Sequence, residues 1–163
     1  MKVLMVSTDR SILTEGSPAR ERMKEYGGLV DELHVVVFSK LKNFQSSIFN
    51  DSISKNFFVY PTNSLSRWLY IFDAYRLGKS LFQIPNSKFQ LLTCQDPFET
   101  GLVGVLLKRR FVVPLQIQIH TDFLSPHFKS QSFLNRIRVL MARVTLQRAD
   151  CIRVVSERIR RSW

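Results

Sequence analysis

His120 and Asp122 are the residues whose types and spacing first suggest chemistry, and they follow the alternating segment QIQI. An imidazole can exchange a proton near neutral pH, and a nearby carboxylate can orient its ring. Asp122 could instead cap the turn that follows, and His120 could be a structural residue. The alternation places Gln116, Gln118 and His120 on one side of a β-strand that ends at the histidine. His120 is therefore the first candidate for a catalytic residue.

The elements that must position this histidine are short apolar segments separated by helical patterns. The segments are rich in Val, Ile, Leu and Phe, and they predict strands at 2–7, 33–39, 57–61, 89–94, 114–120 and 151–156. This order predicts an α/β fold with a doubly wound, mostly parallel, Rossmann-like sheet of about six strands and helices on both faces. The polar stretch 40–56 predicts a surface loop, and residues 1–163 are predicted to form one domain.

Capping residues indicate where the helices begin and end. Ser17 followed by proline predicts the start of one helix, which two glycines close at positions 27–28. In DPFETGLVGVLLKRR, Asp96 is predicted to be an N-cap with Glu99 as its partner in a capping box. The glycines inside that helix indicate a close approach of helix and sheet. Ser156 is predicted to cap a last helix.

The segment SFLNRIRVLMARVTLQRAD predicts a long amphipathic helix. Its apolar residues at helical spacing are Phe133, Ile137, Leu140, Met141 and Val144, with Arg136 and Arg143 along the flank.

Open α/β sheets bind ligands beyond the carboxyl ends of their strands. This rule selects the loop TDRSILTEGSPARER, the turn CQDPFETG and the segment HTDFLSP, each of which leads into a helix N-terminus that favours anions. The first loop has one glycine, Gly16, and lacks a phosphate-binding fingerprint. Arg20 and Arg22 could meet an anionic ligand there, although helix capping explains Gly16 and Ser17 equally well.

The charge balance favours anionic partners. The chain has 24 Lys and Arg against 13 Asp and Glu, and residues 129–163 hold nine of these cations against two acids. Such a field attracts phosphates, nucleic acid or an acidic membrane surface, although many of the arginines could simply keep a helix face soluble. No RRM, KH or helix-turn-helix pattern accompanies the charge, which disfavours nucleic acid.

The cysteines and the N-terminus bear on the compartment. Cys94 and Cys151 lack the spacing of a metal or redox motif, and they are predicted to be buried free thiols in a reducing cytoplasm. MKVLMVSTDR does not have the pattern of a signal peptide, and no run reaches the ~20 apolar residues of a membrane span. We expect a cytoplasmic protein, at most peripheral at the inner face of the cell membrane, with no metal and no cofactor.

The ordered motifs between 91 and 160 resemble a known family. A strand leads into a helix that starts with DPF at 96–98, a second strand ends in HTD at 120–122, and RADCIRVVSE occupies 148–157. This order is similar to the N-terminal half of GT-B glycosyltransferases of group 1, family 4, the retaining type. The opening MKVLMVSTDR fits the family's first strand, so the resemblance spans nearly the whole chain.

The resemblance implies one half of a two-domain enzyme. Such an enzyme transfers a sugar from a nucleotide-sugar, its co-substrate, to a glycan, lipid-linked or small-molecule acceptor without a catalytic metal, and cell-envelope polysaccharide synthesis is an expected role. The N-terminal domain would bind the acceptor. His120 would lie near the transferred sugar, where it contacts a hydroxyl or supports developing charge. The residues expected to bind substrate are Glu15, Gly16, Ser17, Asp96, Asp122, Ser156 and Glu157.

Two departures from the family qualify these expectations. The loop around Glu15 to Ala19, expected near the donor diphosphate and the acceptor, has one glycine where two are common. The donor-binding C-terminal domain, with its paired glutamates, is absent from the 163 residues. We therefore expect this chain alone to be inactive, because transition-state stabilisation would be largely lost.

Family members that use lipid-linked acceptors often dock on anionic membranes through this half. The resemblance thus predicts a membrane or anion patch formed by Arg67, Trp68, Lys129, Arg136 and Arg143. Part of this surface could instead face the second domain.

Two other function classes stay open. A stand-alone basic α/β binding module for nucleic acid or phosphorylated ligands fits the charge. A small α/β hydrolase or reductase with His120 as its base lacks both a GxSxG nucleophile and a dinucleotide fingerprint.

Overall fold

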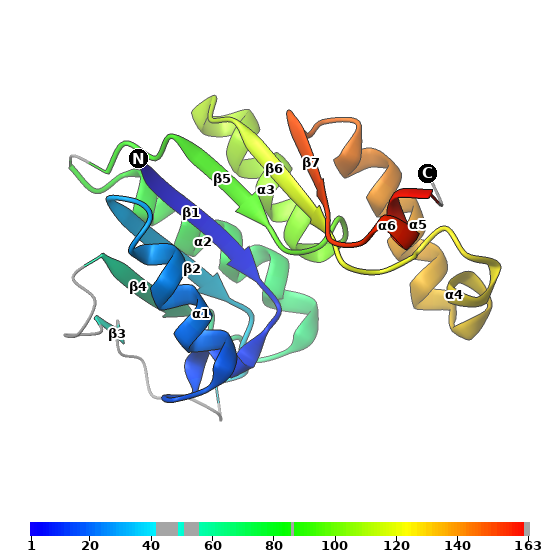
Figure 1. Cartoon of the computed structure of the whole chain (residues 1–163), viewed down its shortest axis with the longest axis horizontal. Helices are drawn as coiled ribbons and strands as arrows, with labels where there is room; N and C mark the ends of the chain where they lie inside the picture. Colours follow the sequence, from blue (N-terminus) through cyan, green and yellow to red (C-terminus); the bar gives the residue numbers. More distant parts are fainter. Residues whose placement is uncertain (42–48, 51–55, 86, 162–163) are drawn as a thin grey trace.

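A seven-stranded sheet forms the centre of the described part of the protein (Figure 1). The structure is a computed structural model that describes residues 1–41, 49–50, 56–85 and 87–161. The strands are β1 Lys2–Ser7, β2 Glu32–Val37, β3 Phe49–Asn50, β4 Phe57–Pro61, β5 Leu91–Cys94, β6 Leu115–Ile119 and β7 Cys151–Val154. The α-helices are α1 Pro18–Gly27, α2 Tyr70–Phe82, α3 Glu99–Phe111, α4 Pro126–Gln131, α5 Phe133–Leu146 and α6 Glu157–Arg161. Two 3-10 turns, η1 Arg10–Leu13 and η2 Arg67–Leu69, complete the order.

The strand order is β3-β4-β2-β1-β5-β6-β7, and every pair is parallel except β3 with β4. The predicted doubly wound, mostly parallel α/β sheet is confirmed. The connections leave β1 and β5 in opposite directions, so the carboxyl ends of these neighbours form a topological switch point. The stretch 40–56, predicted to be loop, contains β3 at its described residues 49–50; most of the stretch lies outside the described residues.

At β1, β2 and β4 both faces of the sheet have an apolar core, because buried parallel strands favour apolar side chains on both sides. Val3 and Met5 of β1 face one side and pack in a cluster with Ala19 and Met23 of α1. Leu4 and Val6 face the other side, in a cluster that includes residues of α2 and α3. A third cluster joins the loop after β6 to α5 and α6; its members include Phe98, Ile119, Phe123, Val139 and Ile159.

Gly104 permits the close approach of α3 to the sheet that its sequence predicts. A Cβ at this position would lie 2.5 Å from Cys94 Sγ and 2.8 Å from Leu115 Cδ1. Gly101 instead faces its own N-terminal turn and α5, since its Cβ would lie 3.0 Å from the Asp96 carbonyl oxygen and 3.4 Å from Thr145 Cβ.

Two sequence-based expectations about local structure are wrong. Helix α3 begins at Glu99 with Phe98 as its N-cap, and Glu99 pairs with Arg138 of α5 instead of closing a capping box with Asp96. Cys94 is buried as expected, but Cys151 is exposed because β7 is the edge strand of the sheet.

The apolar stripe of α5, formed by the residues at helical spacing from Phe133 to Val144, is largely exposed. Phe133 and Leu140 are 75% and 62% exposed, while Val139 and Ala142 face the core. The helical pattern correctly identified residues that share a face, but the core contacts come from a different face.

Candidate functional site

The carboxyl edge of the sheet gathers the polar residues that follow β1, β5 and β6. Ser7 Oγ donates to Gln95 Oε1 across 2.5 Å, which links β1 to the residue after β5 at the switch point. Asp9 follows β1 and accepts from the Ser11 backbone N–H at 3.0 Å, so its carboxylate caps η1. Side-chain hydrogen bonds therefore fix the carboxyl ends of β1 and β5 where they meet.

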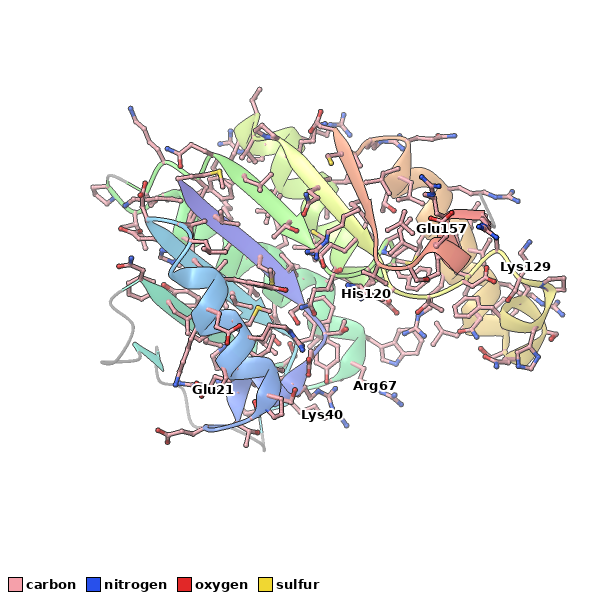
Figure 2. All side chains as sticks on the ribbon, viewed as in Figure 1. Glu21, Lys40, Arg67, His120, Lys129 and Glu157 are labelled. Atoms are coloured by element: carbon pink, nitrogen blue, oxygen red, sulfur yellow. The ribbon has the colours of Figure 1, made fainter. Side chains whose placement is uncertain are left out.

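His120 lies immediately beyond β6, where Figure 2 labels it. Its Nε2 is 3.1 Å from Gln118 Oε1, and the Gln118 amide Nε2 donates to Thr93 Oγ1 at 3.1 Å. The Thr93 hydroxyl in turn donates to Gln116 Oε1 at 3.2 Å. Gln118 and Thr93 are both buried, so a polar chain across β5 and β6 supports an exposed imidazole.

The direction of this chain assigns the tautomer of His120. The amide nitrogen of Gln118 donates to Thr93, so its oxygen is the atom that faces the histidine, and an oxygen can only accept. Nε2 of His120 therefore carries the hydrogen, and Nδ1 is left as an acceptor with no partner among the described residues.

The environment of His120 keeps the imidazole neutral. Its pKa lies below the usual value, mainly because partial burial disfavours the charged ring, and also because the positive charges of Arg153 and Arg22 act on it. A neutral imidazole with a free acceptor nitrogen can accept a hydrogen bond from a hydroxyl group.

Asp122 orients neither His120 nor the following helix. Gln118 holds the imidazole, and Ser125 caps α4 by accepting from the Phe128 N–H at 3.3 Å. The Asp122 backbone carbonyl accepts from Ser125 Oγ at 3.0 Å, and its buried Oδ1 has no hydrogen-bond partner in the described part of the chain.

Asp96 follows β5 and fixes the start of α3. Its Oδ1 accepts from the backbone N–H groups of Phe98 at 2.8 Å and Thr100 at 3.4 Å. Burial disfavours the ionised form, and the nearby Glu99 adds to this, so the pKa of Asp96 is raised to about 6 in spite of these bonds. Asp96 therefore serves the helix, as one reading of the sequence suggested, and titrates close to neutral pH.

The loop after β1 offers Glu15 and Gly16 at its exposed tip. Gly16 has a positive φ of 71°, which explains the single glycine there. Ser17 caps α1, since its Oγ accepts from the Arg20 N–H at 3.1 Å. Arg20 is buried and donates to the Ile12 carbonyl at 3.2 Å, so of Arg20 and Arg22 only Arg22 is exposed to meet an anion.

Ser156 and Glu157 follow β7 and organise α6. Ser156 Oγ accepts from the Ile159 N–H at 3.3 Å, which confirms the predicted cap. Glu157 forms ion pairs with Arg160 and Arg161 of its own helix.

The basic and aromatic residues predicted to form one patch divide into two groups. Arg67 and Trp68 form part of η2, and Trp68 is 87% exposed. Lys129 lies on α4, with Arg136 and Arg143 on α5, and Figure 2 shows Arg67 and Lys129 well apart. Within the described ranges, no helix is long and apolar enough to cross a membrane, and no cluster of three His, Cys, Asp or Glu could hold a metal ion.

Comparison with known proteins adds the family. The sequence model of the family described as Glycosyltransferase Family 4 matches residues 19–163 of the chain. The chain belongs to glycosyltransferase family 4. No curated protein matches this family-4 chain at a significant level.

The fold of this family-4 domain also occurs in a solved structure. The UDP-GlcNAc 2-epimerase from Methanocaldococcus jannaschii superimposes with a TM-score of 0.59 at 9% identity. The match covers 99% of the family-4 chain and 41% of the epimerase. At this identity the likeness concerns the fold, and the family-4 domain spans less than half the length of that structure.

Sequence reasoning missed two residues of the candidate site. Thr93 is a single polar residue in an apolar strand, and its role follows only from its register opposite Gln116. Arg153 counted only as surface charge, yet it pairs in register with Gln118 on the neighbouring strand. The alternation of Gln116, Gln118 and His120 was the signal that did identify their common side.

Proposed function

We propose that this domain is the acceptor-binding half of a retaining glycosyltransferase that uses a nucleotide-sugar donor. The observation that carries the proposal is the neutral His120, held at the carboxyl edge of the sheet by Gln118 with its Nδ1 free. A sugar hydroxyl donates well to such a nitrogen, and a fixed imidazole can support charge that develops during transfer. Family membership favours this function over a stand-alone anion-binding module.

In this proposal the nucleotide-sugar is a co-substrate, and no metal takes part. The donor would be held mainly by residues outside these 163, opposite His120. The solved epimerase is itself named for a UDP-sugar, which supports a nucleotide-sugar as the donor. The 163-residue chain alone is therefore expected to give no turnover.

The test is a transfer assay with the complete gene product. The protein is incubated with a panel of UDP-, GDP- and ADP-sugars and mixed acceptors, and the released nucleoside diphosphate is measured. NMR of the product then determines the anomeric configuration. Release that depends on the acceptor, with the configuration retained, supports the proposal. Absence of transfer with every donor contradicts it, and inversion contradicts the retaining assignment.

A second proposal concerns the membrane. The stripe on α5 is apolar and exposed, and Arg136 and Arg143 on the same helix are exposed as well. A helix with this distribution can place its apolar side in the interface of an anionic bilayer while the arginines contact lipid headgroups. Phe133 and Leu140 would be the deepest residues, since they are the most exposed apolar residues of the stripe.

Vesicle flotation distinguishes binding of this stripe to a bilayer from binding to a protein partner. The chain is expected to float with vesicles that contain phosphatidylglycerol, less so at high salt, and not with phosphatidylcholine alone. Arg136→Gln with Arg143→Gln and, separately, Leu140→Ser should reduce flotation, whereas Arg110→Gln on α3 should not. No binding to anionic vesicles would assign the stripe to a protein contact, and equal binding to neutral vesicles would contradict the electrostatic part of the proposal.

A further inference from the structure

One side of β5, β6 and β7 has no described helix over it. Figure 1 shows α1 in front of β1 and β2, whereas α3 lies behind β5 and β6. The core clusters agree: Leu92 and Ile117 point toward α3, so Thr93, Gln116 and Gln118 point to the open side.

The side chains on this open side are polar, in contrast to the rest of the sheet. The register pairs are Thr93 with Gln116 and Gln118 with Arg153. Paired residues of parallel strands project to the same side, so Arg153 stands next to Gln118 and close to the histidine that Gln118 holds. The polar side chains beside α1 thus run from Thr93 and Gln118, which are buried, to the exposed surface at Arg153 on the edge strand β7.

Two arginines border this surface and carry no compensating charge. Arg153 and Arg22 are exposed, and neither forms an ion pair with any acidic residue in the described part of the chain. Other cations do find acids, since Arg138 pairs with Glu99 and Lys108 with Asp150. Arg22 lies on α1 and Arg153 on β7, and both charges act on His120 from these separate elements.

We propose that Arg22, Arg153 and His120 form a subsite for the phosphate or carboxylate of an anionic acceptor. Guanidinium groups bind such anions through paired, charge-assisted hydrogen bonds, and two of them on separate elements can hold one anionic group from two sides. The free Nδ1 of His120 is then the acceptor for a hydroxyl on the same molecule. This inference rests on the proposed function, and it adds the chemical class of the acceptor.

The diphosphate of the donor can bind arginines in the same way as a phosphate on the acceptor. The test therefore compares an acceptor-like phosphate with a donor-like diphosphate. The 163-residue chain is titrated with glycerol 3-phosphate, with glycerol, and with UDP, while NMR follows the His120 ring. Glycerol 3-phosphate is expected to shift the His120 signals with saturation and to raise the pKa of His120, because an anion stabilises the imidazolium. Glycerol is expected to have no effect, and UDP to bind no better than glycerol 3-phosphate.

Variants locate the subsite. Arg22→Gln and Arg153→Gln should each weaken glycerol 3-phosphate binding by about tenfold, the effect of losing one charge-assisted contact. Without ligand each variant should raise the pKa of His120, because a positive neighbour is removed. Arg76→Gln, an exposed arginine on α2, serves as the matched control and should change neither quantity. All three positions are exposed, so the fold should persist, as a thermal melt can verify.

Three results would overturn the inference: no saturable shift with glycerol 3-phosphate, binding that both variants leave unchanged, or UDP binding much more tightly than glycerol 3-phosphate. Transfer kinetics of the complete gene product distinguish this failure from that of the proposed function. If transfer occurs but Arg153→Gln leaves the KM of a phosphorylated acceptor unchanged, the subsite is wrong and the function stands. If the anion binds as expected but no donor is used, the subsite stands and the function is wrong.

Discussion

His120 Nε2 donates to Gln118 Oε1 across 3.1 Å, so a residue inside β6 orients the histidine that follows the strand. Gln118 is itself fixed by Thr93 on β5, and two strands thereby set the ring position. Asp122, the carboxylate nearest in sequence, has no such role. A histidine held in this way keeps one known nitrogen free, which is what the proposed contact with a sugar hydroxyl requires.

Substitution of Gln118 by Met tests this support. Methionine has a similar length and no hydrogen-bonding amide, so His120 should lose its fixed tautomer, and the buried Thr93 should lose its donor. We expect mixed tautomers in the ¹⁵N spectrum of the His120 ring and a loss of about 1 kcal/mol in the free energy of unfolding. Gln83→Met at the exposed end of α2 is the control. An unchanged His120 tautomer in Gln118→Met would show that the imidazole is held by other groups.

Substitution of Gly104 by Ala tests the close packing of α3 on the sheet. The added methyl group would overlap Cys94 Sγ and Leu115 Cδ1, so the free energy of unfolding should fall by about 1–3 kcal/mol. Gly28→Ala is the matched control, because Gly28 is exposed and has helical dihedral angles that alanine adopts freely. Denaturant titration measures both. Equal stability of Gly104→Ala and the unmodified chain would mean that α3 can move away without cost.

Substitution of Asp96 by Asn should have an effect that depends on pH. Folding raises the pKa of Asp96 from its usual value of 3.8 to about 6, so between these two pH values the folded state binds more protons than the unfolded state. Ionisation of Asp96 therefore lowers the stability of the unmodified chain as pH rises, and the cost is complete above pH 6. Asparagine retains the Oδ1 acceptor for Phe98 and Thr100 but does not ionise.

The stability of Asp96→Asn relative to the unmodified chain should accordingly increase from pH 4 to pH 7, by up to ~3 kcal/mol. Denaturant midpoints at a series of pH values measure this difference. A constant difference across that range would mean that Asp96 has an ordinary pKa in the folded chain.

Local patterns predicted the strands well, because buried parallel strands need nearly continuous apolar residues. KVLMVS became β1 with the expected bounds, and Ser17 and Ser156 cap the helices assigned to them. The His120 side of β6 followed from a period of two, which any strand imposes.

Other features depend on partners that lie far apart in the chain. The exposure of Cys151 follows from the position of β7 at the sheet edge. The apolar stripe of α5 is exposed because another face of this helix packs against α3. Periodicity shows which residues share a face of a helix, but it does not show what covers that face. Thr93 and Arg153 gain their places only through strand register. Glu99 pairs with Arg138 of α5, a contact that no local capping pattern contains.

The most direct test of the central claim is the kcat of sugar transfer by the complete gene product with His120→Ala. We predict a decrease of at least ~100-fold, because a positioned group that supports the transition state would be removed. His127→Ala changes an exposed histidine on α4 and should leave kcat unchanged. A His120→Ala protein that folds normally and retains kcat within about threefold of the unmodified protein would contradict a catalytic role for His120.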